Sequence, residues 1–308
     1  MYYPYFRGKQ FELDTLLEVA RPVYANTLPI IEPVNNNRIT ILRYNSIANR
    51  QIPVILIVNP RHPRIAFSIA DVQRIFIDDA LSTHHSLTLG YIIDQLSSTA
   101  ELSAFLKSNP DNPKAVIFKY TLTPADLAAY DSVLHANTPD ILIFDDRRTS
   151  VRMRTVLGWH TNRVLLTDGF QRQERNSDYP AMSVFDSNTS TWRADGWQGV
   201  GDYLTIGDYF QEGGGQPLVV TFHITAPNGP NLEVHHFSST MLSTVKGRVS
   251  PKFIEACASL VYSPYTIPMS SNGLTLYRDW NLRGHATALG GAKKASMLHH
   301  MELLSSIV

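Results

Sequence analysis

The sequence predicts an α/β protein of the TIM-barrel type, a (β/α)8 barrel with an N-terminal aromatic segment and a late antiparallel β-hairpin. Short apolar, β-branched runs alternate with helical segments through the first half of the chain, which is typical of parallel strands buried on both faces. The 308 residues suit one such domain, spanning 1–308. The competing fold is an open doubly wound sheet, but LPIIEPVNNN carries no glycine-rich nucleotide loop.

Composition and charge narrow the functional classes. With 18% charged residues, zero formal net charge and a pI near 7.2, the chain has no overall electrostatic footprint for nucleic acid or anionic membranes. The single cysteine, Cys257, lies in a helical apolar pattern and is expected in the core, as suits a reducing compartment. The N-terminus lacks the apolar core of a signal peptide, and no run approaches a membrane span of roughly 18 residues. We therefore expect a soluble cytoplasmic protein.

In the first half of the chain, expected strands alternate regularly with expected helices. It opens with YYPYF at residues 2–6, expected to be extended, with Pro4 marking an edge or a cap. Residues 10–20 follow with the apolar spacing of a helix. Further strands are expected at 28–34, 52–59, 89–94, 115–120, 141–146 and 163–168. Helices are expected at 38–48, 72–81, 100–107, from 123, and up to about 157, with Asp71 and Thr123 as N-terminal caps.

The second half breaks this rhythm. Residues 171–201 are polar and aromatic without a regular pattern, which indicates a functional loop or lid. Three strands are expected between 201 and 239, the last two joined by a turn at 228–231. A helix at 251–262 precedes a C-terminal extension, 266–308, that ends in a helix. These runs give about nine strand candidates, one more than a barrel needs, so either 2–6 plugs the barrel bottom or 89–94 lies outside the barrel.

Several stretches together resemble a known family. They are YPYFRGKQFEL, LPIIEPV, the DYLTIGDYF-QEGGG-VVTFHIT block, VHHFSS and the late SMLHHMELL. On these the chain resembles the bacterial and phage Beta-protein family, within it a branch of short bacterial proteins encoded beside a small nuclease-like protein. The resemblance implies a TIM-barrel-like fold and a place in a phage-defence gene pair. It brings no catalytic residues with it.

Polar residues end the strands of the expected barrel, where barrel enzymes keep their working residues. These are Glu32, Asn59, Asp94, Lys119, Asp145, Asp168, Asp208 and His223. Glu32, Asp145 and Asp168 would suit a divalent metal, with Lys119 or His223 assisting phosphoester hydrolysis as catalytic groups. The alternative is structural, because polar residues at strand ends also cap helices and bind loop amides.

The hairpin adds histidines as ligand-binding candidates, beside Asn59 and Asp208. His235 and His236 alternate across a strand, so only one can face inward. His223 lies on the opposite face from its two apolar neighbours, and either serves as a ligand or base or is a hydrogen-bonded core residue. No HExxH or paired Cys-x-x-Cys motif indicates zinc.

Three further stretches have a functional and a simpler interpretation. The glycine-rich stretch 212–215 either wraps a phosphate or, as we favour, forms a turn. Arg7 and Lys9 are expected to lock the barrel bottom. A cluster of arginines either contacts a nucleic-acid phosphate backbone or forms a solvated helix face. Its members are Arg147, Arg148, Arg152 and Arg154.

Two functional hypotheses follow. The first is a barrel that recognises a ligand or a partner in a two-gene phage-defence cassette, acting with the nuclease-like protein. The second is a metal-assisted phosphoester or nucleotide hydrolase. A divalent metal is the one cofactor that the pattern admits, and the ligand expected is a small phosphorylated compound or a nucleic acid, with no membrane involved.

Overall fold

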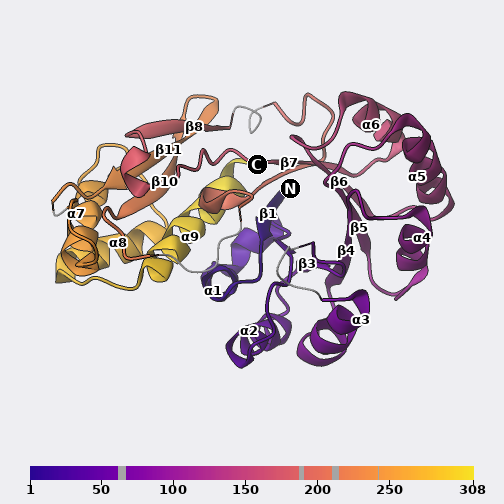
Figure 1. Ribbon diagram of the computed structural model, residues 1–308, viewed down its shortest axis with the longest axis horizontal. Coiled ribbons are helices and arrows are strands. Elements are labelled where there is room, and N and C mark those ends of the chain that lie inside the picture. The colour runs from indigo at the N-terminus through magenta and orange to yellow at the C-terminus, as the bar shows by residue number, and fades with distance from the viewer. Residues whose placement is uncertain (62–66, 187–190, 210–214, 242) are drawn as a thin grey trace.

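The computed structural model describes residues 1–61, 67–186, 191–209, 215–241 and 243–308. Eight parallel strands close into a barrel in the order β1-β2-β3-β4-β5-β6-β7-β9, which confirms the predicted fold (Figure 1). The strands are β1 (Tyr2–Phe6), β2 (Ile30–Ile31), β3 (Val54–Ile57), β4 (Leu87–Ile93), β5 (Lys114–Phe118), β6 (Ile141–Asp145), β7 (Arg163–Thr167) and β9 (Gly199–Asp202).

Both explanations for the surplus strand candidate are wrong. The aromatic segment is strand β1 of the barrel, and the stretch expected at 89–94 is strand β4. Pro4 is tolerated because β9 pairs with the first half of β1 and β2 with the second half, so the proline lies where the pairing changes. The surplus comes from the hairpin, which belongs to a separate sheet.

Helices follow most strands, as the alternation predicts, and side-chain caps begin several of them. Asn37, Ser68, Ser98, Thr123 and Ser150 each accept a backbone N–H bond at an N-cap. The cap expected at Asp71 is wrong, since Ser68 caps that helix and Asp71 completes a capping box. The helices are α1 (Gln10–Glu18), α2 (Arg38–Asn49), α3 (Ile69–Val72) with the π-helical continuation η2 (Gln73–Ala80), α4 (Thr99–Lys107), α5 (Pro124–Ala136) and α6 (Val151–Val156).

A second sheet lies beside the barrel (Figure 1). Its antiparallel strands run in the order β10 (Thr221–Asn228), β11 (Asn231–Ser238) and β8 (Met182–Asp186). The hairpin is the predicted one. Strand β8 falls inside the segment expected to be irregular, because its pairing partner β11 lies about fifty residues later and leaves no local pattern.

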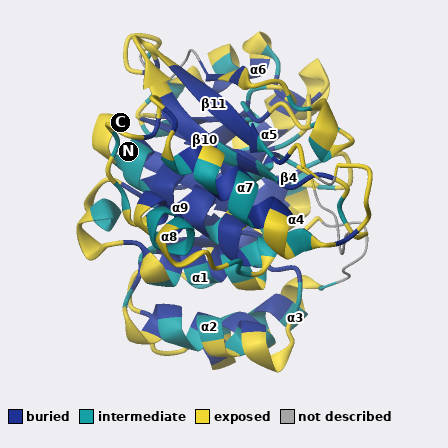
Figure 2. Cartoon of the chain, turned by 90° about the vertical axis from the view of Figure 1, so that its left-hand side faces the viewer, coloured by how far each residue is buried: buried dark blue, intermediate teal, exposed yellow. Residues whose placement is uncertain are grey.

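Three C-terminal helices complete the fold: α7 (Val249–Val261), α8 (Asn272–Arg283) and α9 (Leu289–Ile307). One face of the sheet packs on α7 and α8 through a cluster that includes Phe222, Phe253 and Tyr277. Helix α9 packs against α1, α8 and β10, and most of its middle is buried (Figure 2). It therefore joins the sheet to the barrel. None of the helices in the described ranges has the length and apolar composition that a bilayer crossing requires.

The barrel has two apolar layers that follow the two-residue alternation of its strands. The outer layer includes Phe6, Leu56 and Val116, which face the helices. The interior cluster is formed by Tyr3, Tyr5, Ile30, Ile55, Ile57, Ile92, Ala115, Ile117, Ile141, Ile143, Val164, Leu166 and Tyr203. Residues in step with this inner set therefore point into the barrel.

Candidate ligand site at the barrel mouth

The barrel mouth is the C-terminal end of the barrel strands with the residues that follow them. Continuing the inward alternation to the strand ends and just past them reaches a set of charged side chains two positions beyond an interior residue. They are Arg7, Glu32, Lys119, Asp145 and Asp168. The strands thus bring five of the chain's charges to one place from five different elements.

Asp208, which follows β9, lies at the centre of this set. Arg7 forms an ion pair with its Oδ1, Arg148 forms one with its Oδ2, and Lys119 Nζ lies 3.5 Å from Oδ1. The Asp208 side chain is only 8% exposed, and those of Arg7 and Lys119 are 12% exposed. Burial raises the pKa of Asp208, but the three cations outweigh it and the pKa falls below its ordinary value.

Lys119 is held between aromatic rings. Its Nζ lies 4.6 Å from the ring centre of Tyr5 and 5.0 Å from that of Tyr203. Burial lowers the pKa of Lys119, and Arg7 and Arg148 lower it further, which Asp208 and Glu32 only partly offset.

Two hydroxyl–carboxylate pairs flank this lysine. The Tyr5 hydroxyl donates to Glu32 Oε2 at 2.8 Å, and the Tyr203 hydroxyl donates to Asp145 Oδ2 at 3.0 Å. Asp145 Oδ2 also accepts from Arg148 Nη1 at 3.0 Å. Each carboxylate therefore already has donors before any ligand arrives.

Asp168 is the third carboxylate that the sequence suggested for a metal. Its Oδ2 accepts from Arg147 Nη1 at 3.0 Å and from the Asp208 backbone N–H at 3.1 Å, while its buried Oδ1 has no hydrogen-bond partner. Burial raises its pKa. Within the described ranges, no three His, Cys, Asp or Glu side chains lie close enough together to hold a metal ion. The metal site of Glu32, Asp145 and Asp168 stays a prediction.

Two other predicted residues support the backbone at the rim. The Asn59 side chain both donates to and accepts from the main chain of Ile92, each at 2.8 Å. Asp94 pairs with Arg61 at 3.2 Å and accepts from Ser97 Oγ. These contacts match the structural alternative for polar residues at strand ends.

The histidines of the hairpin form their own cluster. His223 and His236 lie opposite each other with their Nδ1 atoms 2.8 Å apart, and His236 Nε2 lies 2.9 Å from Ser183 Oγ. His235 points to the other face and stacks on Tyr265, so only one of the adjacent histidines joins His223. The cluster packs on Phe170, close to the mouth, but its described contacts include none of the mouth carboxylates.

Burial governs the protonation of these rings. It lowers the pKa of His223 far below its usual value, helped by His236, and lowers that of His236 to about 4. His235 also has a lowered pKa from burial, which Glu233 partly opposes. The cluster is therefore neutral at pH 7.

Sequence reasoning missed four members of the mouth: Arg7, Arg148, Tyr5 and Tyr203. The expected place of Arg7 at the barrel bottom is wrong, because Arg7 follows the last residue of β1 and therefore lies at the opposite end. Side chains alternate along a strand, so Arg7 lies on the same face as Tyr3 and Tyr5. That alternation could have predicted its position at the mouth. Arg148 turns inward to Asp145 and Asp208 instead of following a helix face. Residues 212–214 of the glycine-rich stretch lie outside the described residues.

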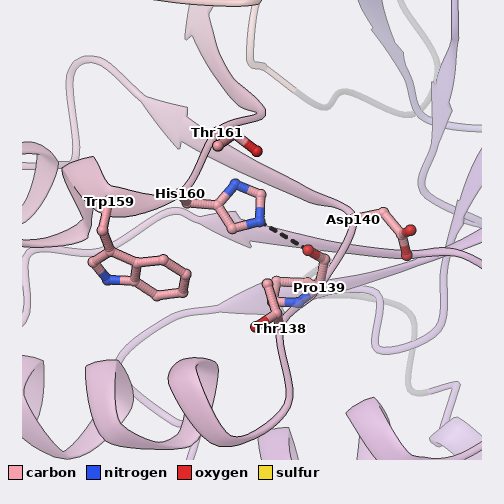
Figure 3. A pocket seen from close by; sticks show the side chains of 6 residues that line it. All are labelled: Thr138, Pro139, Asp140, Trp159, His160 and Thr161. Atoms are coloured by element: carbon pink, nitrogen blue, oxygen red, sulfur yellow. Dashed lines mark hydrogen bonds between the residues drawn. The ribbon is translucent and has the colours of Figure 1, made fainter.

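Two surface hollows lie away from the mouth. One, of about 370 Å³, is at the N-terminal ends of β6 and β7 and is lined by Thr138, Pro139, Asp140, Trp159, His160 and Thr161 (Figure 3). The His160 ring there bonds the Pro139 carbonyl oxygen at 2.8 Å, which ties two loops together. The other, of about 440 Å³, lies beside the ends of α1 and α2. Neither contains a predicted site residue.

The single cysteine belongs to the core. Cys257 is buried in α7, and burial raises the pKa of its thiol to about 12, which makes it a poor nucleophile.

No protein-family model matches the chain, and none of the curated proteins compared with it is similar enough to count as a relative.

Proposed function

We propose that the barrel mouth recognises a small anionic ligand, whose carboxylate or phosphate oxygens take the place of the Asp208 carboxylate. The observation that supports this is the convergence of Arg7, Lys119 and Arg148 on one carboxylate. They come from the segments after β1, β5 and β6, and the carboxylate comes from the segment after β9. The chain is thus a ligand-recognising barrel.

The physical argument concerns buried cations. Arg7 and Lys119, whose side chains are 12% exposed, need a counter-charge because they are largely desolvated, and the anion that supplies it lies within reach of the more exposed Arg148 as well. Guanidinium groups match the paired oxygens of carboxylate and phosphate. Asp208 occupies this position in the structure, and an incoming oxyanion would meet the same donors.

The test compares anion binding in the wild type and in Asp208→Asn. Without ligand, the variant should melt at a lower temperature because Arg7 and Lys119 lose the carboxylate with which they pair, while Arg148 keeps Asp145. Phosphate or pyruvate at constant ionic strength should then stabilise Asp208→Asn more than the wild type, since the internal competitor is gone. Arg148→Gln should weaken anion binding about tenfold or more, which calorimetry measures.

Asp14→Asn is the matched control. It breaks another ion pair, between Asp14 and Arg43 at 2.6 Å, on the outer helices α1 and α2. It should leave anion binding unchanged. Failure of every anion to stabilise both the wild type and Asp208→Asn would contradict the proposal.

We propose the nuclease-like protein as a partner on the family resemblance alone. Co-expression with the product of the adjacent gene, followed by affinity purification, tests it. A stoichiometric complex would support a two-protein system, and separate elution at micromolar concentrations would count against it.

A further inference from the structure

We infer that Lys119 is a nucleophilic amine, and that the anion bound at the mouth is a small carbonyl compound whose carbon forms an iminium with Lys119 Nζ. This inference rests on the proposed function and names its substrate class: an oxo acid, or an aldehyde or ketone that bears a phosphate.

The first support is a comparison with the two buried lysines of the described ranges. Lys114 and Lys252 each direct Nζ to two backbone carbonyl oxygens, which commits that group to a structural role. Lys119 differs. Among the described residues its Nζ has one hydrogen bond, at the long distance of 3.5 Å to Asp208, and it lies on the rings of Tyr5 and Tyr203. Displacement of Asp208 by a ligand would free this amine.

The second support is the arrangement around the amine. Arg7 and Arg148 share the same carboxylate with Lys119, so an anion held by the two guanidinium groups would place its neighbouring carbon beside Nζ. Burial and the two nearby cations favour the neutral amine, which is the reactive form. Lys119 is also in step with Ala115 and Ile117, which face the barrel interior.

The chemistry balances without another reactant. The ammonium form first gives up a proton, the nitrogen lone pair forms the C–N bond, and the carbonyl oxygen takes that proton to become a carbinolamine. A second proton from nitrogen leaves with the hydroxyl as water, and the iminium keeps the single positive charge. The pairs Tyr5–Glu32 and Tyr203–Asp145 flank the amine and are placed to relay these protons.

Reductive trapping tests the inference on the full chain. The protein is incubated with pyruvate or with dihydroxyacetone phosphate, treated with sodium cyanoborohydride, digested and analysed by peptide mass spectrometry. We expect a saturable adduct at Lys119, about tenfold or more above the labelling of Lys114 and Lys252. Arg148→Gln should reduce labelling, whereas Lys114→Gln should leave it unchanged.

The outcomes separate this inference from the proposed function. Calorimetric binding of pyruvate or of the phosphate compound without a Lys119 adduct would overturn the inference and leave anion recognition standing. Equal labelling of Lys114, Lys119 and Lys252 would also overturn it. If the protein shows no binding and no labelling, that result would contradict both the inference and the proposed function. The trapping result comes from the wild type, so it does not depend on whether a Lys119 variant folds.

Discussion

Two histidines of the hairpin share a hydrogen bond that restricts their protonation. The Nδ1 atoms of His223 and His236 lie 2.8 Å apart, so one must donate a proton and the other must accept it. If both rings were protonated, two N–H groups would face each other. Burial among Phe170 and Tyr179 disfavours the added charge as well.

This pair predicts a loss of stability in acid. The folded pKa of His236 is about 4, below an unfolded value near 6.5, so the unfolded chain binds more protons between these values. The contribution of His236 to the free energy of unfolding should therefore be complete above about pH 6.5. It should fall by roughly 2–3 kcal/mol as the pH decreases to 4. Urea unfolding at pH 7, 6, 5 and 4 measures it.

His236→Asn should flatten this pH dependence, and the exposed His85→Asn should not. His299, whose pKa burial also lowers to about 4, adds to the slope in all three proteins. An unchanged slope in His236→Asn would show that the pair does not contribute.

At the scale of elements, the barrel closes through short strands that approach closely. Gly201 of β9 pairs with Tyr3 of β1, and a Cβ atom at Gly201 would overlap the Tyr3 carbonyl oxygen. The Tyr3 carbonyl group belongs to the backbone of β1 and cannot move away without breaking the β1–β9 pairing. The glycine is therefore required by the close approach of two strands.

Gly201→Ala should destabilise the protein by several kcal/mol, about 2–4, because the barrel must open locally to accept one methyl group. Gly158→Ala is the control, since the nearest atom to its added Cβ is the end of the Arg163 side chain at 3.6 Å. Thermal unfolding followed by circular dichroism compares them. Equal melting temperatures would mean that the strands can separate at little cost.

At the scale of the whole molecule, a buried polar chain joins the barrel to the second sheet. The Tyr2 hydroxyl donates to Asp202 Oδ1 at 2.8 Å, and His300 Nε2 of α9 donates to Asp202 Oδ2 at 3.0 Å. His300 Nδ1 lies 2.6 Å from Thr225 Oγ1 of β10. Both His300 and Thr225 are fully buried, so this contact aligns the two parts of the molecule.

His300→Ala should cost about 2–4 kcal/mol, because Asp202 loses a buried donor. The sheet should also loosen from the barrel, which hydrogen exchange would detect as faster exchange in β10 and α9 than in β5 and β6. Exposed His285→Ala serves as the control. Uniform acceleration across the chain would indicate general destabilisation and not a loss of coupling.

The proposed anion site belongs to this same scale, because no single element contains it. Its carboxylates and its lysine could be predicted from the sequence, since each follows a recognisable strand. Its arginines could not, because Arg7 and Arg148 both fit simpler roles near their own elements. Ser183 was missed for a related reason: its strand, β8, pairs only with a strand far along the chain.

The sequence alone determined the fold class, the helix cap at Thr123 and the position of Glu32, Lys119 and Asp145 at the ends of their strands. These properties depend on short-range spacing and on the two-residue alternation of strands, which neighbours in the chain specify. Only the tertiary structure decided which charges meet. Arg7 and Asp208 are 201 residues apart and touch only because β1 pairs with β9 to close the barrel. That closure is a long-range event, and local spacing carries no record of it.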